Sequence, residues 1–446
     1  MIPSFNENEL FPAILRLFHK PKGRKSMKMI FLFICLLTTS LLFAGQDISQ
    51  RVKEFARASR EFQEIERQNF TSHFLSLQKA LTPDSSEFDQ LYYDLNFVVT
   101  TIPENLEGTV TGYFRSNVNG LDRVKLNFDS REDIGAWNDL AVTGNVSGFS
   151  LSNLVLRVDL DKPYGVGEEF SITVHYSGLP RSSGFKAFEF DHNFAGDLVI
   201  STLSEPYLAQ TWWPCKDDPS DKLDSVKISA TVPEDMIVAS NGLLQSVTPG
   251  ANNTKTFVWK EKYPITTYLV SLAISNYVTF RDSFEYQPGK FMPIDYFVYP
   301  GDFNTARSAF AKMPQMLRVY SDAYGLYPFV EEKYGHAEFV WGGAMEHQTC
   351  TSIGRVANSW ETVYAHELSH QWFGDLVTCH DWHNIWMNEG FATFSEALWL
   401  EKAYGKTAYH DYVNYYLDDI DSWATDHVYR YTTDNPGYIF HRTVYT

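Results

Sequence analysis

Residues 361–394 read ETVYAHELSHQWFGDLVTCHDWHNIWMNEGFATF. They contain the pattern HExxH, with His366 and His370 on either side of Glu367. Positions i and i+4 share one face of an α-helix, so both imidazoles can reach a single cation. Glu367 lies beside them, where it can accept a proton from a water that the metal activates. The stretch therefore predicts a helix that carries a metal-dependent hydrolytic site.

A catalytic zinc ion usually takes three protein ligands and keeps a fourth position open. Glu389 lies nineteen residues beyond His370, near the start of a second apolar stretch. This spacing leaves room for a loop between two antiparallel helices. Taken alone, Glu389 would be interpreted as a first-turn carboxylate facing the helix dipole. Beside HExxH we interpret it as the third ligand, so the sequence predicts one Zn²⁺ ion held by His366, His370 and Glu389.

Working outward, the hydrophobic pattern changes along the chain. From about Phe88 to Asp295 apolar and polar residues alternate, as in residues 154–160, and Gly and Asn separate the runs. Such a pattern is typical of half-buried strands in an antiparallel meander. In residues 310–320 apolar side chains recur at helical spacing, and helical patterns continue to the end. We therefore predict a multidomain α+β protein in which an antiparallel β domain is followed by a mainly helical catalytic domain.

The N-terminal residues carry a targeting pattern. Five basic residues between positions 20 and 28 precede an apolar run at 29–43 of about 15 residues, which ends at Ala44 and Gly45. A basic region, a short apolar core and small residues for cleavage describe a secretory signal. The run is shorter than the roughly 20 residues of a membrane-spanning helix. We expect a secreted or periplasmic protein with no stable membrane span after signal cleavage; a membrane anchor is the alternative.

The predicted segments follow from these patterns. The sequence divides into a signal-bearing extension at 1–45, a helical preamble at 46–87, the β domain at 88–297 and the catalytic domain at 298–446. The preamble is expected to pack on the first domain.

Composition limits the classes of function. The chain has 446 residues, 44% of them hydrophobic, and a formal net charge of −18. This is a globular composition, and its acidic balance argues against nucleic acid as a partner, since neutralising phosphates needs basic patches. The four cysteines include no CxxC pair, so we expect them in the core rather than in a metal site or a disulfide framework. The oligomeric state stays open.

Three further motifs lie upstream, in order. They are Pro214-Cys215-Lys216-Asp217-Asp218-Pro219-Ser220, Tyr324-Gly325-Leu326-Tyr327-Pro328-Phe329 and Gly343-Ala344-Met345-Glu346-His347. Together with HExxH, eighteen intervening residues and a Glu inside W-x-x-E-G-F-A, they resemble the M1 zinc aminopeptidases, including the G-A-M-E-N exopeptidase motif of that family. The resemblance spans roughly residues 88–446. It implies a saddle-like β domain and a thermolysin-like catalytic domain.

The resemblance also implies roles in substrate binding. Gly343, Ala344 and Met345 would lie on an edge strand of the substrate cleft, and Glu346 would hold the α-ammonium group of a peptide with a free N-terminus. Glu205 aligns with a second amine-binding residue of the family; a solvated surface acid is the alternative for it. Carboxylates are suitable partners for an ammonium group.

A role in catalysis is implied for Tyr445. In the family a tyrosine within V-Y-x-K-G-A donates to the oxyanion, and this chain ends Val444-Tyr445-Thr446. A core tyrosine is the alternative. On this alignment the catalytic domain is expected to be incomplete at its C-terminus.

Three residues near these motifs affect hydrogen bonding. His347 stands where the family usually has Asn, which would alter hydrogen bonds around the amine pocket without removing Glu346. Asp375, where Asn is more usual, could orient a ligand histidine, since such bonds fix the ring tautomer. Glu396 is another candidate for that role, with a solvated helix face as the alternative.

The resulting hypothesis is a zinc metallo-aminopeptidase in which Glu367 and Tyr445 are catalytic and Glu346 and Glu205 select the N-terminal bond. Two alternatives stay open. One is a thermolysin-like zinc endopeptidase, which would accept N-acetylated substrates. The other is a weakly catalytic peptide-binding module.

Overall fold

A computed structural model of the chain describes residues 48–68, 86–181, 187–420 and 426–445. The signal predicted at 1–45 lies outside these residues. Residues 54–446 form one unit, to which the following description applies. Among the described residues, no helix is long and apolar enough to cross a membrane.

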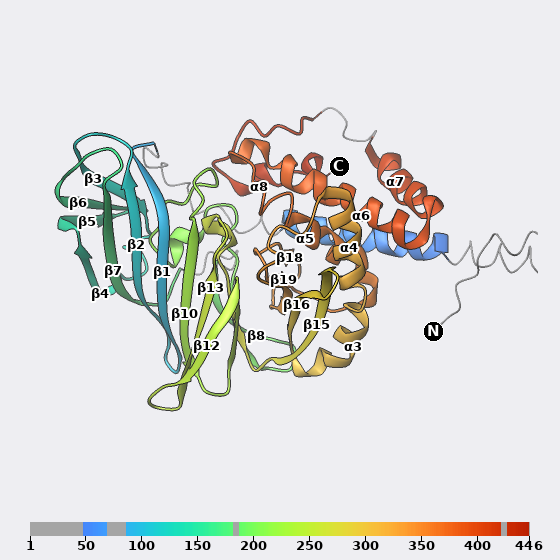
Figure 1. The fold of residues 1–446 in the computed structure, drawn as a ribbon, viewed down its shortest axis with the longest axis horizontal. Coiled ribbons are helices and arrows are strands. Elements are labelled where there is room, and N and C mark those ends of the chain that lie inside the picture. The colour runs from blue at the N-terminus through green and yellow to red at the C-terminus, as the bar shows by residue number, and fades with distance from the viewer. Residues whose placement is uncertain (1–47, 69–85, 182–186, 421–425, 446) are drawn as a thin grey trace, which may run out of the picture. The chain divides into compact units, whose positions relative to one another are not determined.

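Alternating buried and exposed side chains form the largest sheet in the described part of the chain. Its strand order is β12-β13-β10-β1-β2-β7-β4, and its central strands are labelled in Figure 1. The strands are β1 (Phe88–Thr101), β2 (Glu104–Ser116), β4 (Asn138–Gly144), β7 (Glu169–Gly178), β10 (Ser225–Pro233), β12 (Leu243–Pro249) and β13 (Thr254–Glu261). The predicted meander is antiparallel except where β10 runs parallel to β1. The chain reaches β10 by a long crossover rather than a hairpin, which permits the parallel pairing.

Two smaller sheets complete the β-rich part, within the residues that the structure describes. One has the order β11-β14-β9-β8 and the other β3-β6-β5. Their strands are β3 (Leu121–Asn127), β5 (Val146–Ser152), β6 (Val155–Tyr164), β8 (Phe188–His192), β9 (Leu198–Thr202), β11 (Ile237–Ser240) and β14 (Leu272–Ser275).

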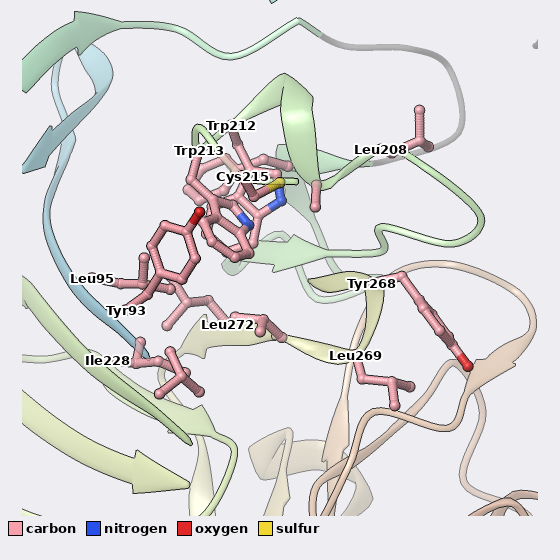
Figure 2. Close-up of a cluster of buried hydrophobic side chains, with 14 of the residues drawn as sticks. Tyr93, Leu95, Leu208, Trp212, Trp213, Cys215, Ile228, Tyr268, Leu269 and Leu272 are labelled. Carbon is pink, nitrogen blue, oxygen red and sulfur yellow. The ribbon is translucent and has the colours of Figure 1, made fainter. Parts of the chain in front are cut away.

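Large aromatic side chains fill the space between these sheets. Trp212 and Trp213 are fully buried beside the short helix η1 (Ala209–Thr211). The rings of Tyr93 and Trp213 meet edge to face at 5.1 Å, and both lie in the cluster that Figure 2 shows. Cys215 is buried in the same cluster, as predicted for the cysteines from the sequence. This core fixes the segment after β9, which carries Glu205.

A mixed sheet connects the β-rich part to the helices. Its order is β15-β16-β17-β19-β18, so β18 lies at an edge. The strands are β15 (Val278–Gln287), β16 (Lys290–Val298), β17 (Tyr334–Glu338), β18 (Ala344–Met345) and β19 (Thr351–Ile353). The sheet takes strands from both sides of the domain boundary proposed at 297 and 298, and that boundary stays a prediction.

Helices dominate the remainder, so the predicted fold class is confirmed. Besides the helix at residues 48–68, the described helices are α3 (Phe303–Ala309), α4 (Met313–Tyr324), α5 (Glu361–His370), α6 (Trp386–Tyr404), α7 (Lys406–Ile420) and α8 (Pro436–Ile439), with short 3-10 turns η2 (Thr267–Leu269), η3 (Pro300–Asp302), η4 (Asn358–Trp360), η5 (Trp382–Asn384) and η6 (Arg442–Val444). α5 packs against α6, and α6 against α7. Gly405 follows the last residue of α6 as its C-terminal cap, and its φ of +92° suits glycine at that position.

One expectation about packing is wrong. The predicted preamble contains a helix at residues 48–68, and the ring contacts and hydrogen bonds described for it are with the helical part of the chain. The ring of Phe62 meets Trp360, and Phe55 meets Tyr404 on α6. The amphipathic pattern indicated a buried face, yet it contained no information about which surface that face covers.

Asp217, in the segment after η1, provides a test of this interior. It is buried and accepts hydrogen bonds from Thr267 Oγ1 (2.8 Å) and the backbone N–H of Gln210 (3.2 Å), yet burial raises its pKa to about 7. A raised carboxyl pKa contributes stability below the unfolded value of about 4, and that stability is lost as the pH rises through the folded value. Asp217→Asn, which cannot ionise, is therefore expected to gain stability relative to the wild type between about pH 4.5 and 7.5. Urea unfolding midpoints at both pH values measure this.

Asp235→Asn, in an exposed turn, is the control and should show no such change. A stability difference between Asp217→Asn and the wild type that does not vary with pH would contradict the ionisation argument.

Candidate metal centre

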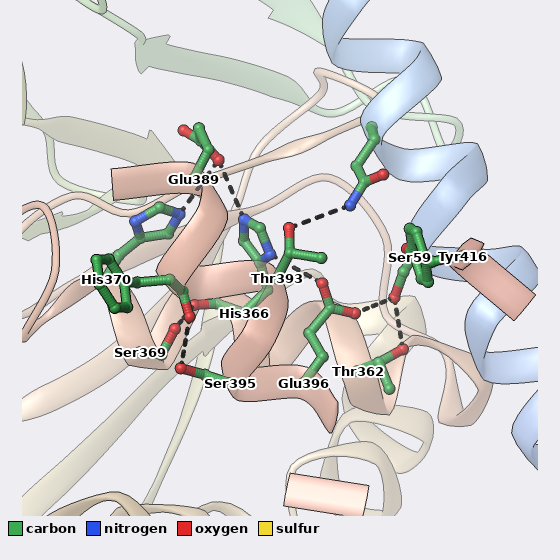
Figure 3. A network of polar contacts seen from close by, with 12 residues as sticks. Ser59, Thr362, His366, Ser369, His370, Glu389, Thr393, Ser395, Glu396 and Tyr416 are labelled. Atoms are coloured by element: carbon green, nitrogen blue, oxygen red, sulfur yellow. Dashed lines mark hydrogen bonds and ion pairs between the residues drawn. The ribbon is translucent and has the colours of Figure 1, made fainter. Parts of the chain in front are cut away.

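The predicted ligands come together where α5 packs on α6. His366 and His370 face the same side of α5, and Glu389 lies in the first turn of α6 (Figure 3). Glu389 Oε2 lies 3.3 Å from His366 Nε2 and 3.6 Å from His370 Nε2. One ligand atom from each of the three residues falls within 4.8 Å of the others. All three side chains are buried, so the loop between the helices brings them together as the spacing predicted.

These distances suit a zinc ion. Ligand atoms about 2.0–2.1 Å from a tetrahedral zinc lie roughly 3.4 Å from one another. Two imidazole nitrogens and one carboxylate oxygen are the donor set of catalytic zinc sites that keep a fourth position open. The three residues present therefore fit the predicted Zn²⁺ ion.

The outer nitrogens of both imidazoles are held by hydrogen bonds. His366 Nδ1 donates to Glu396 Oε1 (2.9 Å), and His370 Nδ1 donates to the backbone carbonyl of Phe373 (2.9 Å). These bonds direct Nε2 of each ring towards Glu389 Oε2, where a metal ion would bind. Glu396 is fully buried, so the helix-face alternative for it is wrong. Asp375 does not orient a ligand, because both of its carboxylate oxygens lack a partner among the described residues.

The electrostatics of the group favour a cation. Burial alone lowers the pKa of His366, but the carboxylates of Glu389 and Glu396 outweigh it and raise that pKa well above its usual value. Burial raises the pKa of Glu389, but His370 and His366 outweigh this effect and bring it to about 2. In the metal-free protein, the carboxylates thus draw positive charge onto the imidazoles.

Glu367 directly follows the ligand His366 on α5 and is 1% exposed. Burial raises its pKa to about 8, although His366 and His370 oppose the shift, and its Oε2 has no partner among the described residues. A buried carboxylate beside a metal site, with a raised pKa and an oxygen that no described group occupies, suits a general base.

A second group of carboxylates adjoins the ligands. Oxygens of Glu205, Glu346 and Glu389 lie within 4.8 Å of one another. Glu346 follows the edge strand β18, as the resemblance implied for Ala344 and Met345, while Glu205 precedes Pro206 in the segment after β9. Oε1 of Glu205 and Oε1 of Glu346 have no partner in the described part of the chain.

Burial raises the pKa of Glu346, and burial together with the charges of Glu346 and Glu389 raises that of Glu205 well above normal. Glu205 is only 3% exposed, so the surface-acid alternative is wrong. Two buried carboxylates, each with an oxygen that lacks a partner among the described residues, are chemically suited to a small cation such as an ammonium group.

Comparison with known proteins identifies the family. Residues 89–269 match the Peptidase M1 N-terminal domain, and residues 341–446 match the Peptidase family M1 domain. The chain belongs to peptidase family M1. This confirms the predicted family and its zinc cofactor, while the roles of individual residues stay predictions.

Relatives and solved structures agree with this assignment. Probable aminopeptidase 2 of Sulfurisphaera tokodaii is 29% identical over 61% of this chain and 34% of its own length. Endoplasmic reticulum aminopeptidase 1 of Homo sapiens is 27% identical over 62% of this chain and 31% of its own length. The chain thus spans about a third of these curated relatives.

The M1 zinc metallopeptidase from Deinococcus radiodurans superposes with a TM-score of 0.67 at 25% identity, covering 80% of each chain. A second structure of that enzyme, bound to the substrate Tyr-Ser-Ala, gives 0.65 at 25% identity over the same 80% of each chain.

Two connections hold the M1 motifs in place. Gln371, directly after α5, donates to the backbone carbonyl of Glu346 (3.3 Å) and accepts from the backbone N–H of Thr349 (2.9 Å). These bonds tie the GAMEH segment to the metal-binding helix. His347 stands where the family usually has Asn, and its Nδ1 pairs with Ser352 Oγ (2.9 Å) on β19. This histidine therefore finds a hydrogen-bond partner within the sheet.

Tyr445, the predicted oxyanion donor, lies beside α6. It follows η6 and is 1% exposed. The residue before it, Val444, lies close to Gly390 of α6: a Cβ atom added to this glycine would be 3.3 Å from the Val444 carbonyl oxygen. Burial raises the pKa of Tyr445, and the charges of Glu66, Glu389 and Glu205 add to the shift. Tyr445 is therefore buried, as the core-tyrosine alternative requires, but its burial does not exclude a role at the site.

Sequence reasoning missed the contribution of the N-terminal helix. Ser59, Phe62 and Glu66 lie on one face of it at spacings of three and four residues and are all buried. Burial raises the pKa of Glu66 well above normal, and the charges of Glu389 and Glu367 add to that rise. The helical period indicated that one face of this segment is buried. The only sign in the sequence that this face lies near the metal site was that it carries two polar residues, Ser59 and Glu66.

Removal of a ligand tests the metal site. His370→Ala deletes one of the three ligands, so zinc affinity should fall by more than about 100-fold. Losing only a hydrogen-bond partner of a ligand costs less than this. Competition with a chromophoric chelator measures the affinity. His410→Ala, on α7 outside the group, is the matched control, and equal affinity of both variants would overturn the assignment.

Proposed function

We propose that the chain is a zinc aminopeptidase that hydrolyses the first bond of a peptide with a free N-terminus. The observation that carries the proposal is the pair of buried carboxylates Glu205 and Glu346, which lie close to Glu389 and each have one oxygen without a partner among the described residues. An ammonium group held there would place the N-terminal residue, and only that residue, next to the metal. Such anchoring separates an exopeptidase from an endopeptidase.

The chemistry divides among the chain's own residues. When bound, zinc polarises the peptide carbonyl and acidifies water. Glu367 takes a proton from the attacking water and returns it to the leaving amine. Tyr445 remains protonated because its pKa is raised, so its hydroxyl can donate to the oxyanion that develops on the carbonyl. Glu346 and Glu205 bind the ammonium group and set the register of the substrate.

Aminopeptidase names among the relatives and the Tyr-Ser-Ala complex of the Deinococcus radiodurans enzyme support this proposal. The endopeptidase alternative lacks a use for Glu205 and Glu346. The binding-module alternative lacks a use for the free oxygen of Glu367.

Hydrolysis of alanyl-p-nitroanilide and of its N-acetyl derivative tests the proposal. We expect cleavage of the free amine alone, because acetylation removes the cation that Glu346 and Glu205 bind. Glu367→Gln should keep zinc and lose about 10²–10⁴-fold in kcat, the usual contribution of general acid–base catalysis. Glu346→Gln should lose at least about 10-fold in kcat/KM on the free amine, as expected for a charge-assisted hydrogen bond.

Glu331→Gln, at an exposed position, is the matched control and should behave as the wild type. Cleavage of both substrates would replace the proposal with an endopeptidase. Cleavage of neither by the zinc-bound protein would favour a peptide-binding module.

We also propose that the protein is exported, on the basis of the basic and apolar runs that end at Gly45. The N-terminal sequence of protein recovered outside the cytoplasm measures this. A start at Gln46 is expected, since cleavage follows small residues. Retention of the apolar run at 29–43 in the mature protein would overturn it in favour of a membrane anchor.

A further inference from the structure

The helix at residues 48–68 lies outside both segments that match the M1 family, which begin at residue 89. Its residues 54–68 nevertheless contact the two helices that carry the metal ligands. Figure 3 shows this helix in blue beside the network that contains His366 and Glu389. These contacts reach a metal ligand through two separate side chains.

The first connection is a relay of hydrogen bonds. Ser59 Oγ donates to Glu396 Oε2, and it also lies 2.8 Å from Thr362 Oγ1 on α5. Tyr412 OH donates to the same Glu396 oxygen. The other oxygen of Glu396 accepts from His366 Nδ1 at 2.9 Å. Ser59 thus restrains the carboxylate that orients the ligand ring.

The second connection is direct packing. The ring of Phe62 meets the imidazole of His366 edge to face, with centroids 5.6 Å apart and an interplanar angle of 72°. Phe62 is 1% exposed, so it covers the ring from water. On the next position, Gln63 Nε2 donates to Thr393 Oγ1 (3.4 Å) on α6. The helix therefore bridges α5 and α6 at the level of the ligands.

We propose that Ser59 and Phe62 are positioning residues of the zinc centre. Ser59 acts through Glu396 and fixes the tautomer and direction of His366, and Phe62 limits rotation of the same ring. The N-terminal helix is thus part of the metal site although it lies outside the matched family segments. The inference rests on the proposed zinc site, but it concerns metal binding and not the choice between exopeptidase and endopeptidase.

Zinc affinity and metal geometry test the proposal. Ser59→Ala removes one donor from Glu396, and Phe62→Ala frees one side of the ring, so each should weaken zinc binding by about 10-fold or more, as other outer-shell losses do. Ser59→Thr keeps the hydroxyl and should remain within about 3-fold of the wild type. In cobalt-substituted protein, Ser59→Ala and Phe62→Ala should shift the visible absorption bands of the metal, and Ser59→Thr should not.

Glu61→Ala, at an exposed position of the same helix, is the matched control and should change neither readout. Unfolding temperatures of the metal-free variants separate positioning from general packing. The proposal is overturned if Ser59→Ala and Phe62→Ala bind zinc as tightly as the wild type, or if they lower the unfolding temperature with cobalt spectra unchanged. Because zinc binding is measured without substrate, this failure is distinct from a failure of the aminopeptidase assignment.

Discussion

The arrangement of the site depends on burying several carboxylates close together beside α5 and α6. Glu205, Glu346 and Glu389 bring carboxylate oxygens within 4.8 Å of one another with almost no exposure to water. Buried carboxylates are costly unless cations or hydrogen bonds compensate them. In the metal-free protein, the raised pKa of His366 provides part of that compensation. A zinc ion would provide two charges and a substrate ammonium group one more, so metal and substrate would each relieve a cost already built into the fold.

That cost explains why the surroundings are so firmly connected. Glu389 depends on the start of α6, Glu346 on an edge strand and Glu205 on the aromatic core around Trp212. The side chain of Gln371 ties the segment after the edge strand to α5 by two hydrogen bonds, and its partners in that segment are backbone groups. Because like charges repel, any loosening would let the carboxylates separate and would lose the geometry that two cations require. Packing in the β-rich part thus maintains an electrostatic arrangement in the helical part.

The parts of the site that sequence predicted are those fixed by local geometry. His366 and His370 follow from one helical turn, and Glu389 from the length of the connecting loop. Asp375 was wrongly expected to orient a histidine because a backbone carbonyl, that of Phe373, reaches His370 first. Backbone acceptors leave no trace in the side-chain pattern. The parallel pairing of β10 with β1 was missed for a related reason, since alternation reports which face is buried but not which strand is the neighbour.

The N-terminal helix shows how far a short motif depends on distant sequence. The hydrogen bond from Ser59 to Glu396 joins residues 337 positions apart, whereas HExxH spans little more than one turn. A metal ligand oriented by so distant a segment acquires its final geometry only after that segment has docked. Since the unfolded chain has no such site, zinc stabilises the docked state to which it binds, so docking of the helix and binding of the metal strengthen each other. Zinc affinity is therefore a property of the folded unit as a whole, and the motif by itself specifies only which atoms bind.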